Sequence, residues 1–177
     1  MEMEKRIHAA ADYIRQRISI KPTVGLILGS GLGDIADMLE DRTLIPYEEI
    51  PYFPCSGVEG HAGRLVAGRI RGREVLVMQG RVHYYEGYAQ QLITVPVRVM
   101  HQLGVKSLVL TNAAGGVNLD FKPGDLMLIS DHINFSGSNP LLGPNLAEFG
   151  PRFPDASDIY TEALREKIRE RAAQAGV

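Results

Sequence analysis

Three polar clusters, each placed directly after an apolar run, carry the residue types from which an anion site can be built. In the first, "GSGLGD", Ser30 stands among glycines after the apolar run 24–28. Backbone N–H groups of a glycine turn, together with a hydroxyl, suit an oxyanion such as phosphate. The glycines follow G-x-G-x-G, one residue short of the dinucleotide fingerprint, and the Gly-Lys-Ser/Thr ending of a P-loop is absent. On this loop alone, a plain strand-to-helix turn with a solvated serine is favoured over a phosphate site.

The second cluster, "QGRVHYYEGY", follows the apolar run 75–78. Arg81 and His83 are two residues apart, so an extended chain places both on one face. Arginine is a forked cation that suits phosphate. Glu86 could orient the His83 imidazole and keep it protonated. The alternative is an exposed loop with ordinary surface charges, but the density of tyrosines beside a buried strand favours a function.

The third cluster, "VLTNAAGGVN", ends an apolar run in small residues, against which a ligand could lie close to bare backbone. Tight packing would be served equally well by the same residues. His61, between glycines, is weak evidence by itself, and the spacing of the histidines matches no metal site. Cys55 has no identifiable base and is interpreted as a plain residue. Because ligands of open α/β sheets bind beyond the strand ends, three such loops predict one shared crevice.

Length, composition and charge narrow the class of protein. The chain has 177 residues, 45% of them hydrophobic, which is enough for one domain with a core. A net charge of −2 without a basic block makes nucleic acid a poor partner. One cysteine excludes an internal disulfide framework and suits a reducing compartment. With a charged N-terminus unlike a signal peptide and no apolar run of membrane-spanning length, the sequence predicts a soluble cytoplasmic protein.

Apolar spacing predicts the elements that position these loops. An amphipathic helix near the N-terminus, ended by Pro22, is indicated by Ile7, Ala10, Ala11, Ile14 and Ile18. Strands are expected at 24–28, in two runs of 64–79 joined by a hairpin at Arg71–Gly72, at 107–110 and at 126–129. Further helices are expected at 34–40, at 88–103, and at about 158–175 between Ser157 and Gly176 as caps. Proline-containing loops are expected at 41–60 and 131–154.

The alternation of strands and helices predicts an α/β fold with three layers, in which helices flank a mainly parallel or mixed central sheet. Beyond this, the residues from about 24 to 160 resemble a known family, the trimeric purine nucleoside phosphorylases. The resemblance is carried, in order, by "LILGSGLG", "GHAGRLVAG", "GRVHYYEGY", "LTNAAGGVN", "GDLMLISDHIN", "NPLLGPN" and "RFPDASDIY". It implies a phosphorylase-type fold, with residues 1–177 as a single domain that forms the N-terminal part of a longer family domain and is incomplete at its C-terminus.

The resemblance also implies an activity. Members of the family cleave purine nucleosides of the inosine and guanosine type with inorganic phosphate, giving the free base and ribose 1-phosphate in purine salvage. Phosphate is a co-substrate, and no metal or organic cofactor is expected. A cytoplasmic homotrimer is implied, without nucleic acid or membrane partners.

By the same resemblance, particular residues acquire roles. Phosphate binding is implied for Ser30, His61, Arg81, His83 and the backbone at Ala113. Nucleoside binding is implied for Tyr85, Ala114, Gly115 and Phe153, the last reaching the ribose pocket of a neighbouring subunit. His83 and Glu86 are the expected catalytic residues, with Glu86 supporting the histidine.

One departure from the family leaves alternatives open. The glutamate and asparagine that read the purine have no counterpart in this sequence, so the choice between 6-oxo and 6-amino purines is not fixed. The 177 residues alone are expected to show little or no phosphorolysis. A methylthioadenosine phosphorylase of the same fold is disfavoured by "HYYEGY", and a nicotinamide-dependent dehydrogenase rests only on the glycine loop. A non-catalytic phosphate- or nucleoside-binding fragment is the remaining alternative.

Overall fold

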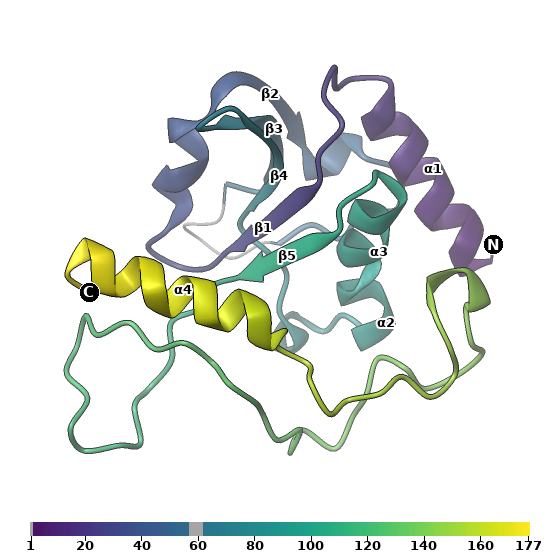
Figure 1. Ribbon diagram of the computed structural model, residues 1–177. Helices are drawn as coiled ribbons and strands as arrows, with labels where there is room; N and C mark the ends of the chain where they lie inside the picture. The colour runs from purple at the N-terminus through teal and green to yellow at the C-terminus, as the bar shows by residue number, and fades with distance from the viewer. Residues whose placement is uncertain (1, 57–61) are drawn as a thin grey trace. The chain divides into compact units, whose positions relative to one another are not determined.

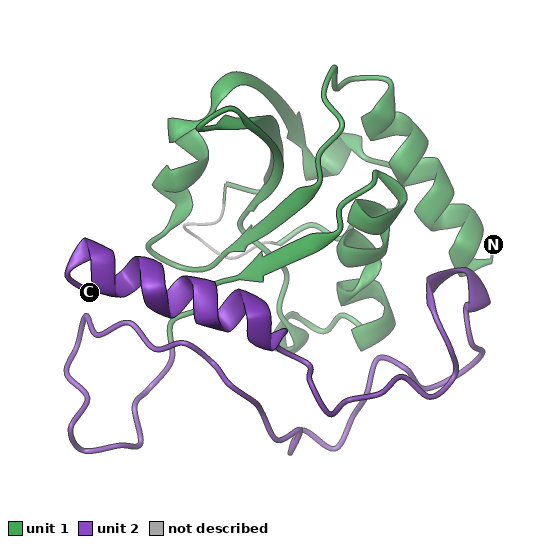
Figure 2. Ribbon diagram, in the orientation of Figure 1, with its two compact units in different colours: residues 1–113 green, residues 114–177 purple. Residues whose placement is uncertain are grey.

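The structure is a computed structural model that describes residues 2–56 and 62–177 (Figure 1). The chain divides into two compact units, residues 1–113 and 114–177 (Figure 2). The expectation of one domain over 1–177 stays a prediction.

The first unit is built on a mixed sheet of five strands in the order β2-β3-β4-β1-β5 (Figure 1). The strands are β1 Val24–Leu28, β2 Glu40–Pro46, β3 Arg64–Ile70, β4 Arg73–Gln79 and β5 Ser107–Leu110. β1 runs parallel to β4 and β5, whereas β2, β3 and β4 pair antiparallel. The carboxyl ends of β4, β1 and β5 therefore lie at one edge of the sheet, and the three polar clusters follow from that edge.

The predicted hairpin is confirmed. β3 and β4 pair from Arg64 with Gln79 to Ile70 with Arg73. Arg71 and Gly72, between the strands, have φ angles of 49° and 74°. Two successive positive φ angles are what a two-residue type I′ turn requires, because that turn matches the twist of the strands.

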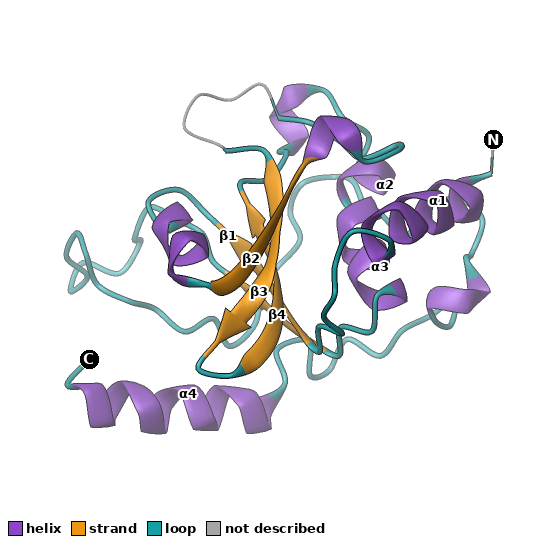
Figure 3. Cartoon of the chain, turned by 90° about the horizontal axis from the view of Figure 1, so that it is seen from above, coloured by secondary structure: helices purple, strands orange, loops and turns teal. Residues whose placement is uncertain are grey.

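Helices cover one face of this sheet. α1 (Met3–Arg15), α2 (Gln90–Ile93) and α3 (Val95–Gln102) lie together on one side of it (Figure 3). α1 buries the predicted stripe up to Ile14 but ends well before Pro22, because Arg17 N–H turns back to the Ile14 carbonyl at 2.9 Å. The single helix expected at 88–103 is broken into two segments near Pro96, whose ring nitrogen cannot donate a hydrogen bond. α3 packs on β1 at Gly25, where an added Cβ would lie 2.9 Å from Met100 Sδ.

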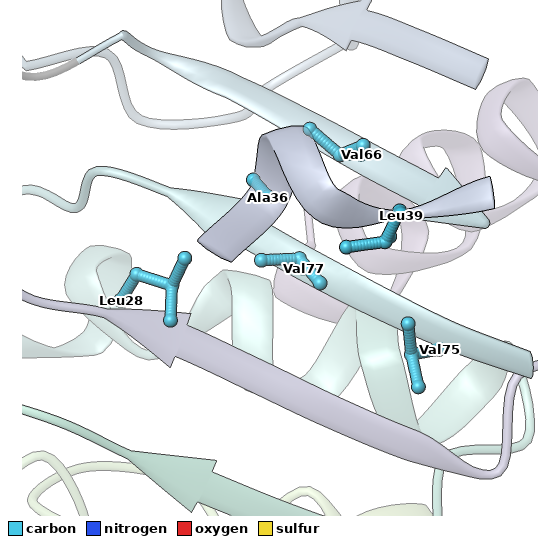
Figure 4. Packing of buried hydrophobic residues seen from close by; sticks show 6 residues of the cluster. All are labelled: Leu28, Ala36, Leu39, Val66, Val75 and Val77. Atoms are coloured by element: carbon cyan, nitrogen blue, oxygen red, sulfur yellow. The ribbon is translucent and has the colours of Figure 1, made fainter. Parts of the chain in front are cut away.

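The other face is covered by η1, a 3₁₀ helix at Gly33–Met38, where a short helix was expected. An apolar cluster connects η1 to the sheet (Figure 4), and its buried members are Leu28, Ala36, Leu39, Val66, Val75 and Val77. In β4, Val75 and Val77 are two apart and share this face, as the alternation of a strand requires. Helices on both faces confirm the predicted three layers.

The loop predicted at 41–60 is wrong in its first half. Residues up to Pro46 form β2, and Tyr47–Glu49 form the 3₁₀ helix η2. Among the residues that the structure describes, β2 pairs with β3 alone and has an irregular register between Glu40 and Thr43, so the apolar alternation that marks a strand is interrupted. A strand at the edge of a sheet tolerates charges and a terminal proline, which is why this one resembles a loop in sequence.

The second unit is mostly irregular, and the long loop expected at 131–154 is confirmed apart from the 3₁₀ helix η4 at Ala147–Phe149. The strand predicted at 126–129 is wrong: these residues have no strand conformation, and Leu126 and Met127 are 80% and 59% exposed. An apolar run becomes a strand only where a neighbouring strand can bond to it, and no sheet partner contacts this run among the described residues.

The last helix, α4, spans Glu162–Ala175. Its N-cap is Thr161 and not Ser157, whose hydroxyl instead donates to Asp155 Oδ1 at 2.6 Å. Gly176 has a φ of 75° at the C-terminal cap, as predicted. Within the described parts of both units, no helix is long and apolar enough to cross a membrane.

Candidate functional site

A cavity of about 260 Å³ opens at the carboxyl ends of β1 and β4. The loops that follow these two strands supply most of the cavity lining, and Ala62, two positions before β3, also belongs to it. The lining residues are Gly29, Ser30, Gly31, Gly33, Asp34, Ala62, Gln79 and Gly80. The first polar cluster therefore borders a cavity at the sheet edge where the second cluster begins.

The glycine turn after β1 is shaped by its backbone. Leu32 N–H donates to the Gly29 carbonyl at 3.2 Å, and between them Gly31 has a φ of 83°, which favours glycine. Gly29 N–H donates to Thr111 Oγ1 at 2.9 Å. A Cβ at Gly29 would lie 2.6 Å from the Thr111 carbonyl oxygen and 2.9 Å from Asn112 Cα. Only glycine fits this approach, which packs the first loop against the residues that follow β5.

Arg81 ties the loop after β4 to the same place. Its Nη1 donates to the Thr111 carbonyl oxygen at 2.5 Å. Thr111 thus contacts Gly29 through its hydroxyl and Arg81 through its carbonyl. All three polar clusters meet around this one residue, although no residue of the third cluster belongs to the described lining of the cavity.

His83 and Glu86 form a compact pair in the loop after β4. His83 is the N-cap of the 3₁₀ helix η3 (Tyr84–Glu86). Glu86 Oε1 accepts a hydrogen bond from His83 N–H at 2.6 Å and lies 3.2 Å from His83 Nδ1, and Ser56 Oγ donates to Glu86 Oε2 at 2.9 Å. The His83 and Glu86 side chains are 25% and 10% exposed. A carboxylate held from two sides in this way fixes the imidazole beside it.

A family model described as the phosphorylase superfamily matches residues 23–177. The chain belongs to the phosphorylase superfamily. Purine nucleoside phosphorylase 1 of Bacillus subtilis is 57% identical over 169 residues, which are 94% of this chain and 62% of the relative. Purine nucleoside phosphorylase of Mus musculus is 52% identical over 160 residues, which are 89% of this chain and 55% of the relative.

Solved structures of superfamily members have the same fold. Isoform 2 of purine nucleoside phosphorylase from Schistosoma mansoni, in complex with cytosine and ribose-1-phosphate, superimposes with a TM-score of 0.91 at 47% identity. The match covers 97% of this chain and 61% of that one. The chain thus spans about three-fifths of the length of these relatives.

Of the residues predicted to bind phosphate, some line the cavity and others lie outside its described lining. Ser30 lines the cavity and is exposed to it. Arg81 and His83 lie in the loop after β4, and neither belongs to the described lining of the cavity. Ala113 follows Thr111 by two residues at the end of the first unit. His61 lies outside the described residues.

The residues predicted for the nucleoside are also divided. Tyr85 is 74% exposed and stacks on the His83 ring with centroids 4.9 Å apart. Ala114, Gly115 and Phe153 belong to the second unit, in which the Phe153 side chain is 87% exposed. The roles of all these residues stay predictions.

Sequence reasoning missed two polar side chains at this edge of the sheet. Tyr47 is buried, and its hydroxyl donates to the Gly80 carbonyl at 2.7 Å. Burial, with a smaller contribution from Cys55, raises the pKa of Tyr47, so the hydroxyl keeps the proton it donates. The other is Gln79, only 6% exposed. A polar residue at the end of an apolar run was the available signal for Gln79, whereas Tyr47 was hidden in a segment interpreted as loop.

Proposed function

We propose that this chain supplies the phosphate side of a purine nucleoside phosphorylase site. The products of that reaction are a free purine and ribose 1-phosphate, which places the protein in purine salvage. The observation that carries the proposal is the cavity bordered by Ser30 and its glycine turn, in a chain 57% identical to a purine nucleoside phosphorylase. Further support comes from Schistosoma mansoni purine nucleoside phosphorylases, whose solved complexes contain ribose-1-phosphate, hypoxanthine and adenosine.

The chemistry fits the donors that the chain offers. A phosphate oxygen forms a bond to C1′ of the ribose while the bond from C1′ to the purine nitrogen breaks, and the purine leaves with the bonding pair and takes up a proton. The sugar passes through an oxocarbenium-like state. Catalysis then depends on holding the phosphate in line and on electrostatic stabilisation. Ser30, the Arg81 guanidinium and the His83 ring hold the phosphate, and Glu86 holds His83.

The remaining parts of the proposal concern the nucleoside and the assembly. The Ala113 backbone and His61 complete the phosphate site. Tyr85 offers the ribose a flat apolar surface, and Ala114 and Gly115 lie along the nucleoside. In a homotrimer, Phe153 reaches the ribose pocket of the neighbouring subunit. The reaction needs no metal or organic cofactor, and it takes place in the cytoplasm.

The test combines phosphate binding with turnover. Isothermal titration of the chain with inorganic phosphate should show saturable binding that Arg81→Ala weakens far more than it weakens binding of inosine. Release of hypoxanthine from inosine, dependent on phosphate, is then compared with release of adenine from methylthioadenosine. A preference for inosine supports the purine nucleoside reaction, and a preference for methylthioadenosine supports the sister activity. Phosphate binding without release of either base identifies a non-catalytic binding fragment, and no phosphate binding overturns the proposal.

A further inference from the structure

Gln79 is a buried amide at the end of an apolar row. Val75, Val77 and Gln79 alternate along the face of β4 that η1 covers, and the two valines belong to the apolar cluster of Figure 4. Gln79 is 6% exposed, yet it also borders the cavity. Burial of an amide is unfavourable unless its polar atoms are bonded. Its position therefore calls for partners on both the oxygen and the nitrogen.

Both ends of the amide have such partners. Gln79 Nε2 donates to the Gly33 carbonyl oxygen at 2.9 Å, and Gln79 Oε1 accepts from Arg64 Nε at 2.6 Å. Arg64 and Gln79 are directly opposite each other on β3 and β4, which explains why they meet. Since Arg64 can only donate, the amide oxygen must face it, and the NH₂ group is left to face Gly33.

Arg64 is itself held by η1. Its Nη2 lies 3.4 Å from Asp37 Oδ1, and Arg42 Nη1 donates to the same oxygen at 2.8 Å. η1 begins at Gly33 and contains Asp37. The chain of contacts from Asp37 through Arg64 and Gln79 to Gly33 therefore holds the helix at its first residue and near its last.

We propose that Gln79, oriented by Arg64, is a positioning residue that holds the turn of residues 29–33 in the form that binds phosphate. Gly33 ends that turn and borders the same cavity as Ser30 and Gln79, so a shift of Gly33 moves the wall of the cavity. Arg64 acts through Gln79 and not on the phosphate. The proposal rests on the proposed function, because it assigns phosphate to this cavity.

Gln79→Met tests the role of the amide with a side chain of similar length. It removes the donor to the Gly33 carbonyl and the acceptor of Arg64 Nε, so phosphate affinity measured by titration should fall roughly tenfold. Arg64→Gln, outside the cavity lining, should give a smaller loss of about threefold by releasing the amide. Arg69→Gln is the matched control, because Arg69 lies on the same strand and bonds Asp41 and Glu74 at its other end. The control should bind phosphate as the unmodified chain does.

A second measurement separates positioning from general destabilisation. Hydrogen exchange followed by mass spectrometry should show faster exchange in the turn of residues 29–33 for Gln79→Met and Arg64→Gln, while the strands of the 64–79 hairpin exchange as before. Unchanged phosphate affinity in both variants, with the unmodified chain binding phosphate, would overturn the positioning role and leave the proposed function intact. Unchanged exchange in the turn would also overturn it. Failure of the unmodified chain to bind phosphate would overturn the proposed function and this role together.

Discussion

The loops that follow β1 and β4 reach the same edge of the sheet, but they are held in place by different means. The loop after β1 depends on its backbone: Gly29 packs against Thr111 and Asn112 so closely that a Cβ has no room. The loop after β4 depends on its side chains, since Glu86 bonds His83 and Ser56, and Arg81 reaches the Thr111 carbonyl. The conformation of the loop after β1 thus requires a residue without a side chain, whereas that of the loop after β4 depends on contacts of charged side chains.

This difference predicts two kinds of response to mutation. A substitution in the first loop must displace backbone, so it should affect stability and binding together. Replacing a charged side chain of the second loop by an uncharged one of the same shape leaves the packing intact and removes an electrostatic contact. Such a substitution should affect phosphate binding more than stability.

Gly29→Ala should give the largest effect. The new Cβ would lie 2.6 Å from the Thr111 carbonyl oxygen, so backbone at the end of β5 has to move. Forcing an extra methyl group into packed structure costs about 1–3 kcal/mol. We expect the free energy of unfolding in urea to fall by that amount, and phosphate affinity to fall at least tenfold by titration.

Gly33→Ala is the matched control in the same loop. Its Cβ would first meet Gln79 Nε2 at 3.7 Å, which is ordinary contact. We therefore expect a change in unfolding free energy below about 0.5 kcal/mol, as for a substitution away from strained or crowded sites. Equal losses for Gly29→Ala and Gly33→Ala would show that close packing on Thr111 does not shape the loop.

The strands around the first loop were predictable because their signals are local. β1 and β5 are short apolar runs, and the β3–β4 hairpin is indicated by two strand-like runs separated by two residues that end in Gly72. The contact of Gly29 with Thr111 was not predictable, since the two residues are 82 positions apart and meet only once β1 and β5 pair. Spacing indicated that the loops converge, but not which atoms touch.

Two other features show where local pattern fails. β2 was missed because an edge strand pairs on one side only and needs no regular apolar alternation. Residues 126–129 have the pattern of a buried strand and are nevertheless exposed, because pattern gives a tendency and pairing gives the structure. The contacts of His83 with Glu86 were easier to anticipate, since the residues are three positions apart and one turn of 3₁₀ helix brings them together.

Glu86→Gln should give an intermediate effect confined to binding. The substitution keeps the shape, and the new amide oxygen can still accept from His83 N–H, but the negative charge next to the His83 ring is removed. We expect phosphate affinity to fall about three- to tenfold, with a smaller change in unfolding free energy. The control is Glu49→Gln, on the 3₁₀ helix η2, where an exposed carboxylate accepts from Tyr13 OH at 3.2 Å. If Glu86→Gln lost stability as Gly29→Ala does, the contrast between the loops would be wrong.

The smallest predicted effect concerns Cys55. This residue contacts the loop after β4, where Tyr88 OH donates to the Cys55 carbonyl oxygen at 2.8 Å. Burial, followed by the charge of Glu48, raises the pKa of the Cys55 thiol. The rate of alkylation by iodoacetamide should therefore rise with pH at a higher midpoint in the folded chain than in urea. The native state disfavours the Cys55 thiolate. The contribution of this group to the free energy of unfolding is therefore fully present below the thiol's pKa in the unfolded state, and it is lost as the pH rises through the thiol's pKa in the folded state. Glu48→Gln should lower the folded midpoint slightly, whereas Glu49→Gln should leave it unchanged. A folded midpoint at or below the unfolded one would contradict this account of the thiol's surroundings.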